Sequence, residues 1–288
     1  MSLTPINLLA ALILFTMMTV VGLELTLADF RRVIERPRAV LLGTLAQLTL
    51  LPAATALLLL AFPLAGNMAA GVVLIAVAPG GGISNVFCYL AGANVALSIT
   101  LTGLSSLAAA VTFPVLAALG LKWFAGEAVA VDLPVMALIG QMLFLVLLPV
   151  CLGMMVRHRW PRLAVRYGGP LRRFTFLAII GLLVIAMASD TTGLAGQGLD
   201  GLLTALIWTV MAMVLGWMVA RATGLQPDEA FTLLIEFSVR NVGLAAIVAL
   251  AVLERPDLAV FFGAYVLVGY PLAGLVSLAY RKRADQRQ

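Results

Sequence analysis

Glu236 is a carboxylate within an otherwise apolar stretch, and this gives it the clearest capacity for chemistry in the chain. A charge at bilayer depth is costly, so such a carboxylate needs a partner or a cation. Arg240 follows four residues later and would face Glu236 across one turn of a continuous helix. Two interpretations therefore stay open: a cation bound beside Glu236, or a structural ion pair between the two side chains with no ion.

A second unusual stretch, residues 79–85, reads Pro-Gly-Gly-Gly-Ile-Ser-Asn. It cannot continue as a regular helix, because proline lacks a backbone donor and glycine loses the most backbone entropy. At membrane depth, freed backbone groups are tolerated only inside protein or beside a wet cavity, as in the broken transporter helices that bind ions. The stretch predicts a helix broken in mid-membrane, and a kink that serves only packing is the alternative.

Further polar oxygens lie nearby in the sequence. Ser98 and Thr102 are four residues apart and share a helix face, and Gln47 adds an amide in an earlier apolar segment. Hydroxyls in membrane helices commonly bond the carbonyl one turn back, so this pair alone is more typical of packing than of a ligand site.

These residues must be positioned by membrane-spanning helices. The chain has 288 residues, of which 63% are hydrophobic and 11% charged, and its mean hydropathy is +1.11. A span needs about 20 apolar residues, so the predicted fold is an all-α integral membrane protein with about nine spans. The predicted spans cover about 3–27, 39–61, 67–92, 94–119, 132–156, 171–190, 201–221, 228–253 and 257–280.

The composition also excludes other classes. The net charge of +5 comes from cations in short loops rather than one basic face, so we expect no nucleic-acid partner, and no obligate protein partner is indicated. The one histidine, His158, lies among loop arginines, and Glu24 near the end of the first span is interpreted as interfacial. No hydrolase motif is present, so we predict that the protein is not an enzyme.

Most lysines and arginines fall in alternate loops, which predicts an outside N-terminus and a cytoplasmic C-terminus. The first apolar run lacks a basic start and a cleavage-type end, so we expect it to stay as a helix. With this orientation, residues 39–119 and 201–280 each hold three spans of opposite topology with an interrupted middle span. Two sets of three spans with opposite topology predict an inverted repeat.

Several of these residues recur together at a distinctive spacing. They are Pro79, Gly80, Gly81, Ser84, Asn85, Ser98, Thr102, Glu236 and Asn241, with Gln47 upstream. The set resembles the bile acid:sodium symporter family, and the resemblance covers nearly the whole chain. It is most similar to the nine-helix form, here as a bacterial member in the inner membrane.

The resemblance implies one transporter unit, residues 1–288, with a core domain and a panel domain. The core would be two inverted three-helix units, at about 39–119 and 201–280, whose discontinuous helices cross near the ion sites. The panel would hold the helices at about 3–27, 132–156 and 171–190, and the core would move against it in alternating access.

The resemblance also implies a first sodium site. Its ligands would be Ser84, Asn85, Ser98, Thr102 and Glu236. A hard cation takes carboxylate, amide and hydroxyl oxygens, which these residues supply. A second site would use Gln47, Glu236 and nearby backbone, together with a glutamine where this chain has Arg240. A guanidinium has no acceptor, so we expect one bound Na⁺, with Arg240 occupying the place of the second ion.

The solute implied by the resemblance is a small organic anion carried through the lipid bilayer. Asn241 would be its polar contact, and Gly82 stands where the family often has a hydroxyl residue, which counts against a steroid-like substrate. A sodium-independent or proton-coupled carrier or exporter of the same fold is the main alternative. A sensor or passive channel of this fold is another.

Overall fold

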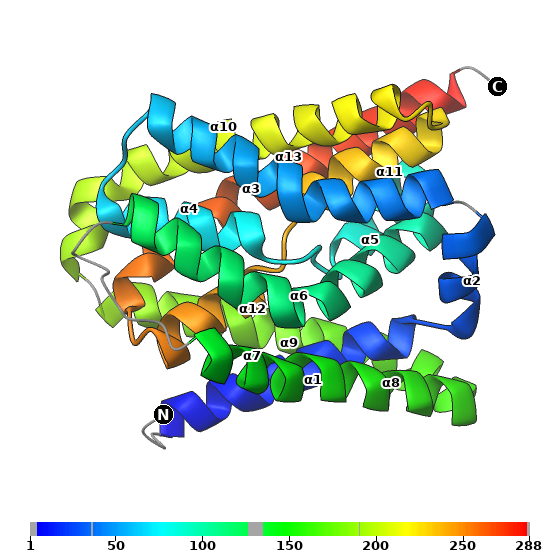
Figure 1. Ribbon diagram of the computed structural model, residues 1–288, viewed down its shortest axis with the longest axis horizontal. Helices are drawn as coiled ribbons and strands as arrows, with labels where there is room; N and C mark the ends of the chain where they lie inside the picture. Colours follow the sequence, from blue (N-terminus) through cyan, green and yellow to red (C-terminus); the bar gives the residue numbers. More distant parts are fainter. Residues whose placement is uncertain (1–4, 36, 126–134, 190, 287–288) are drawn as a thin grey trace.

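The computed structural model describes residues 5–35, 37–125, 135–189 and 191–286, in which the regular elements are helices. In chain order these are α1 (Pro5–Glu24), α2 (Leu27–Glu35), the π-helical η1 (Arg38–Leu42), α3 (Gly43–Ala61), α4 (Gly66–Val77), α5 (Ser84–Ala91), α6 (Val95–Phe124), α7 (Val135–Met142), the π-helical η3 (Leu143–Leu147), α8 (Leu148–Arg159), α9 (Pro161–Ser189), α10 (Thr191–Ala222), α11 (Pro227–Ser238), α12 (Val242–Ile247), the π-helical η4 (Val248–Val252), the 3₁₀ turn η5 (Pro256–Leu258) and α13 (Ala259–Asp285). Figure 1 shows most of them running in one common direction through the molecule.

The prediction of an all-α membrane protein is confirmed. Within the described residues, six helices are long and apolar enough to cross a bilayer, or seven if the bent pair α1 and α2 counts as one span. Two shorter apolar helices, Gly66–Val77 and Val242–Val252, belong to the interrupted segments. Length and apolarity thus identify six or seven spans, and the count of nine stays a prediction.

Both predicted interruptions are present. The first breaks the helix after Val77, where Ala78 is extended, and α5 resumes at Ser84. The second follows Ser238, where Val239 is extended, and α12 resumes at Val242. Proline and glycine explain the first break locally, whereas the second has neither and depends on the contacts around it.

The two breaks cross and hydrogen-bond to each other near the centre of the molecule (Figure 1). The Gly81 N–H donates to the Val239 carbonyl at 2.9 Å, and the Asn241 N–H donates to the Pro79 carbonyl at 2.9 Å. Exposed backbone groups at this depth would otherwise be unsatisfied, so each break supplies the partners that the other lacks.

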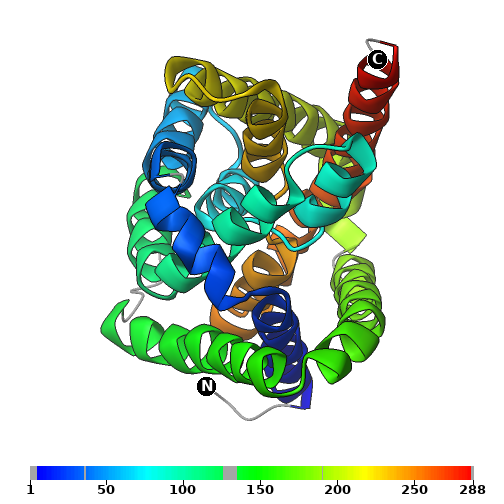
Figure 2. The same ribbon diagram turned by 90° about the vertical axis from the view of Figure 1, so that its right-hand side faces the viewer.

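Three helices, α1, α8 and α9, pack together along one side of the molecule, away from α10 and α11 (Figure 2). The contact between α1 and α8 is close because two glycines face the opposing backbone. A Cβ on Gly22 would lie 2.1 Å from the Val150 carbonyl oxygen, and one on Gly153 would lie 2.2 Å from that of Thr19. Small residues allow such close packing of membrane helices.

Some predicted boundaries are wrong. The first helix ends at Glu24 rather than 27, and α2 then leaves at a bend of 63°. The helix predicted from 171 begins at Pro161, because proline suits a first helical turn and the charged turns before the apolar run are also helical. Similarly, α10 begins at Thr191 rather than 201. The predicted residues 3, 4, 132–134 and 190 lie outside the described residues.

Candidate functional site

The Glu236 carboxylate is fully buried at the crossing and is surrounded by hydroxyl groups. The Ser84 hydroxyl donates to its Oε1, and the Ser98 hydroxyl donates to the same atom at 2.5 Å. The Thr102 hydroxyl lies 3.1 Å from Oε1 and 3.0 Å from Oε2. Three hydroxyl residues from two helices, α5 and α6, therefore converge on the carboxylate that α11 supplies.

Local structure explains how these side chains meet. Ser84 is the first residue of α5 because the break ends there, and Glu236 lies in the last turn of α11 because the next break begins after it. Ser98 and Thr102 lie one turn apart on α6, whose start is capped by the Asn94 side chain accepting from the Leu97 N–H at 3.0 Å. The two breaks thus end helices where polar side chains can gather.

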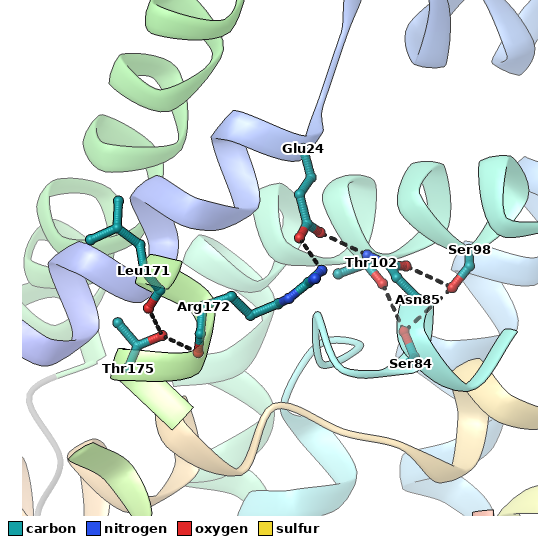
Figure 3. A network of polar contacts seen from close by, with 8 residues as sticks. All are labelled: Glu24, Ser84, Asn85, Ser98, Thr102, Leu171, Arg172 and Thr175. Carbon is teal, nitrogen blue, oxygen red and sulfur yellow. Dashed lines mark hydrogen bonds and ion pairs between the residues drawn. The ribbon is translucent and has the colours of Figure 1, made fainter. Parts of the chain in front are cut away.

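Asn85 connects this cluster to the side of the molecule formed by α1 and α9 (Figure 3). Its Oδ1 lies 2.7 Å from the Ser98 hydroxyl oxygen, whose single proton it shares with Glu236, and its Nδ2 donates to Glu24 Oε2 at 2.8 Å. Glu24 Oε1 in turn accepts from Arg172 Nη1 at 2.7 Å. The polar network therefore extends beyond the residues predicted from the sequence.

Arg240 is also fully buried, but the partners of its guanidinium are other oxygens than the Glu236 carboxylate. Its Nη1 donates to Gln47 Oε1 at 2.8 Å and to the main-chain oxygen of Glu236 at 3.1 Å, and its Nη2 donates to the Ala78 carbonyl. The helix ends at Ser238, so the side-chain ion pair expected of a continuous helix does not form.

Two tyrosines of α13 satisfy the backbone of the second break. The Tyr265 hydroxyl accepts from the Arg240 N–H at 2.7 Å and donates to the Ser238 carbonyl at 2.6 Å. The Tyr270 hydroxyl donates to the Arg240 carbonyl at 3.1 Å. Sequence analysis missed both tyrosines, although a phenol inside an apolar span is a signal that it needs a polar partner.

The glycines of the first break have distinct surroundings. A Cβ on Gly80 would lie 2.5 Å from Glu236 Oε2, and one on Gly81 would lie 2.8 Å from the Arg240 carbonyl oxygen. A Cβ on Gly82 would have no neighbour within 4 Å. The first two glycines permit the close crossing, and Gly82 faces open space.

Two cavities adjoin the crossing. A small one of about 70 Å³ is lined by Gly82 and Asn241 from the crossing, by Tyr270 of α13, and by residues of α1 and α9. A larger one of about 410 Å³ is lined by Asn85 and by side chains of α6, α8 and α9. Glu24 and Arg172 line both cavities.

The structure therefore sorts the predicted residues into three adjacent groups. Ser84, Asn85, Ser98 and Thr102 gather around Glu236; Gln47 holds Arg240; and Gly82 and Asn241 line the small cavity. Asn241 also caps α12, with its Oδ1 accepting from the Leu244 N–H at 3.0 Å. Sequence analysis missed the contacts of Glu24 and Arg172, and their only signal was charge close to an apolar span.

The donors around Glu236 also indicate which kind of ion they suit. Carboxylate, amide and hydroxyl oxygens suit a hard cation, whereas sulfur and imidazole suit transition metals. In the part of the chain that the structure describes, no group of three or more His, Cys, Asp or Glu side chains could hold a metal ion. The fold and the site together define a helical membrane protein with an oxygen-rich cluster between two crossing breaks.

Comparison with known proteins places the chain in a family. The model of the sodium bile acid symporter family matches residues 11–196, so the chain belongs to this family of membrane transporters. It is therefore a multi-pass membrane protein of a transporter family.

Individual relatives agree with this placement. The chain is 31% identical over 236 residues to a probable sodium/metabolite cotransporter, BASS1, of Oryza sativa, covering 82% of this chain and 56% of the relative. It is 28% identical over 268 residues to the sodium-dependent transporter YocS of Bacillus subtilis, covering 93% and 81%. It is 26% identical to the human ileal sodium/bile acid cotransporter, covering 90% and 72%. The chain thus spans little more than half of the rice protein.

Proposed function

We propose that this protein is a secondary active transporter that carries a small organic anion together with Na⁺. The observation that carries the proposal is the convergence of Ser84, Ser98 and Thr102 on the buried Glu236 carboxylate. Sodium is a co-transported substrate here, and these oxygens with the Asn85 amide form the donor set that a hard cation prefers. The family membership supports sodium as the coupled ion.

We further propose a single sodium site, at Ser84, Asn85, Ser98, Thr102 and Glu236. Arg240 takes the place of a second ion, because its Nη1 lies between the Gln47 side-chain oxygen and the main-chain oxygen of Glu236. Both are oxygens that a cation would use, and a guanidinium with five donors satisfies them without an ion. The absence of a bond to the Glu236 carboxylate leaves that carboxylate available to Na⁺.

The transport cycle that we propose is alternating access in a protein of nine spans. The inverted units at about 39–119 and 201–280 form the moving core, and α1, α8 and α9 belong to the panel. The small cavity beside Gly82 and Asn241 lies between α1, α9 and the crossing, where a solute could contact both parts. Asn241 is the proposed polar contact of the solute.

We propose a cell-membrane location with the N-terminus outside and the C-terminus in the cytoplasm. The basic last turns of α8 and α13 lie toward the right of Figure 1, as does α2 with Arg31 and Arg32, whereas α1 begins on the opposite side. Cytoplasmic flanks of membrane helices carry an excess of lysine and arginine, and this supports the orientation.

The test is uptake into proteoliposomes of candidate organic anions under a sodium gradient, a potassium gradient or a pH gradient. We expect uptake to require sodium, with a Hill coefficient of about one because one ion binds per cycle. A coefficient of about two would overturn the single site, since it needs at least two interacting ions. Uptake that ignores sodium but follows the pH gradient would favour a proton-coupled carrier instead.

A further inference from the structure

The Glu24–Arg172 pair lies at the boundary between the two cavities. Glu24 is the last residue of α1, and Arg172 lies on α9. Both residues line the cavity of about 70 Å³ beside the crossing and the cavity of about 410 Å³ beside Asn85. A solute that passes from one cavity to the other therefore meets this pair.

The guanidinium of Arg172 has unused binding capacity. Its side chain is 39% exposed, and within the described residues its only hydrogen bond runs from Nη1 to Glu24 Oε1. A guanidinium has five N–H donors in a fixed fork that matches a carboxylate through two parallel bonds. The contact with Glu24 is thus a partial one, and a second carboxylate could bind more completely.

The charges around the cavities favour an anion. Among the described residues, the charged side chains lining the larger cavity are Glu24, Arg157 and Arg172, and those lining the smaller one are Glu24 and Arg172. Glu24 balances the charge of one of the two arginines, so the lining of the larger cavity has a net charge of +1. Low-dielectric walls concentrate such a potential on an entering ligand.

Through Asn85, Glu24 also connects to Ser98, one of the hydroxyl residues that surround Glu236 (Figure 3). The other oxygen of Glu24 accepts from Asn85 Nδ2 at 2.8 Å, while Asn85 Oδ1 lies 2.7 Å from the Ser98 hydroxyl oxygen. A group that displaces Glu24 from Arg172 therefore also alters the hydrogen bond between Glu24 and the Asn85 amide. Such a shared side chain is a physical route for coupling between two ligands.

We propose that Arg172 binds the carboxylate of the transported solute, and that Glu24 occupies the guanidinium until the solute arrives. This inference rests on the proposed function and names its anion-binding residue. The incoming carboxylate takes the Arg172 donors, Glu24 separates from Arg172, and the altered Glu24–Asn85 contact transmits solute binding to the sodium site.

The test uses the straight-chain carboxylates from propionate to hexanoate, each paired with its uncharged primary amide. The purified full-length protein is heated in detergent with sodium chloride, and the ligand concentration that gives half of the maximal rise in Tm is recorded. We expect wild-type protein to prefer at least one carboxylate over its amide. We expect Arg172→Gln to weaken that carboxylate by about tenfold or more, because a charge-assisted bidentate contact is lost.

Four variants separate binding from general folding and charge effects. Arg172→Lys retains the charge without the fork and should recover part of the preference. Glu24→Gln removes the competing carboxylate and should tighten carboxylate binding, an effect that a purely structural pair would not produce. Arg173→Gln, at an exposed neighbour on the same helix, should change nothing. Arg157→Gln removes a charge of the larger cavity and should weaken binding by about threefold at most, as a screened charge does.

Some outcomes would overturn the proposal. These are no carboxylate preference in the wild type, equal losses in Arg157→Gln and Arg172→Gln, or weaker binding in Glu24→Gln. The rise in Tm caused by sodium alone is measured on the same samples without any organic ligand. If sodium raises the Tm but the carboxylate prediction fails, the assignment of Arg172 as the anion-binding residue is wrong and the sodium-coupled function stands. If sodium does not raise the Tm, the proposed function itself fails.

Discussion

The surroundings of Glu236 and Arg240 differ sharply although both residues belong to the same crossing. The Glu236 carboxylate receives three hydroxyl donors and has no fixed positive charge bonded to it. Arg240, four residues later, places its own positive charge among the oxygens of Gln47, Ala78 and Glu236. One half of the crossing thus has a negative charge that a mobile cation can balance, while the other half carries a cation of its own.

In the proposed single-site scheme, this difference lets one side chain set how many sodium ions the transporter binds. A sodium ion and a guanidinium both satisfy oxygen acceptors, but only the ion can leave. A tethered cation keeps the crossing intact without adding to the transported charge. The following variants break or sharpen this contrast.

The largest effect is expected for Glu236→Gln. The variant removes the only carboxylate among the proposed ligands, so sodium affinity should fall by about 100-fold, equivalent to about 3 kcal/mol for lost charged contacts. The measurement is the sodium concentration that gives half-maximal stabilisation of the purified protein. Glu35→Gln at an exposed ion pair is the matched control and should leave that concentration unchanged. Equal sodium affinity in both variants would contradict the site.

A smaller loss is expected for Gly80→Ala. The new Cβ would meet the Glu236 carboxylate at 2.5 Å, so the ligand must shift. Overpacking of this kind costs about 1–3 kcal/mol, which corresponds to a loss of about tenfold in sodium affinity. Gly82→Ala meets no atom within 4 Å and serves as the control, with sodium affinity retained and only solute affinity altered.

Arg240→Gln should change stoichiometry rather than affinity. It removes the tethered cation and supplies an acceptor oxygen, so the Hill coefficient of sodium-dependent uptake should rise from about one to about two. Arg240→Met removes the charge without adding an acceptor and should leave the coefficient at about one. A coefficient that is unchanged in Arg240→Gln would mean that the arginine does not occupy an ion's place.

The smallest effect on ion binding is expected for Tyr265→Phe. The lost hydroxyl leaves the Arg240 N–H and the Ser238 carbonyl without their partner, which should lower the stability by about 1–3 kcal/mol. Thermal unfolding followed by circular dichroism reports the loss, and the sodium Hill coefficient should stay at that of the wild type. Leu267→Ala, at an exposed position of the same helix, should cost much less.

Several features of the fold and site were predictable, because they are local properties of the chain. Pro79 and the three glycines after it interrupt a helix whatever surrounds them, and the break is present. The boundary errors have a physical cause: apolarity defines where a helix can cross a membrane, whereas α9 extends through charged turns beyond the apolar run. The second break has no such local signal and was inferred only from its polar side chains.

The sequence by itself determined that the protein is a bundle of membrane helices, and it determined which side-chain oxygens are present. Both follow from the length of the apolar segments and from side-chain chemistry, which do not depend on tertiary contacts. Only the tertiary structure decided that Arg240 bonds Gln47 and Ala78 rather than the Glu236 carboxylate, and that Glu24 joins Asn85 to Arg172. These partners lie far apart in the chain, so their pairing depends on how two broken helices cross and how α1 and α9 pack beside them. The periodicity of a sequence does not show which side chains far apart in the chain come close together in the fold.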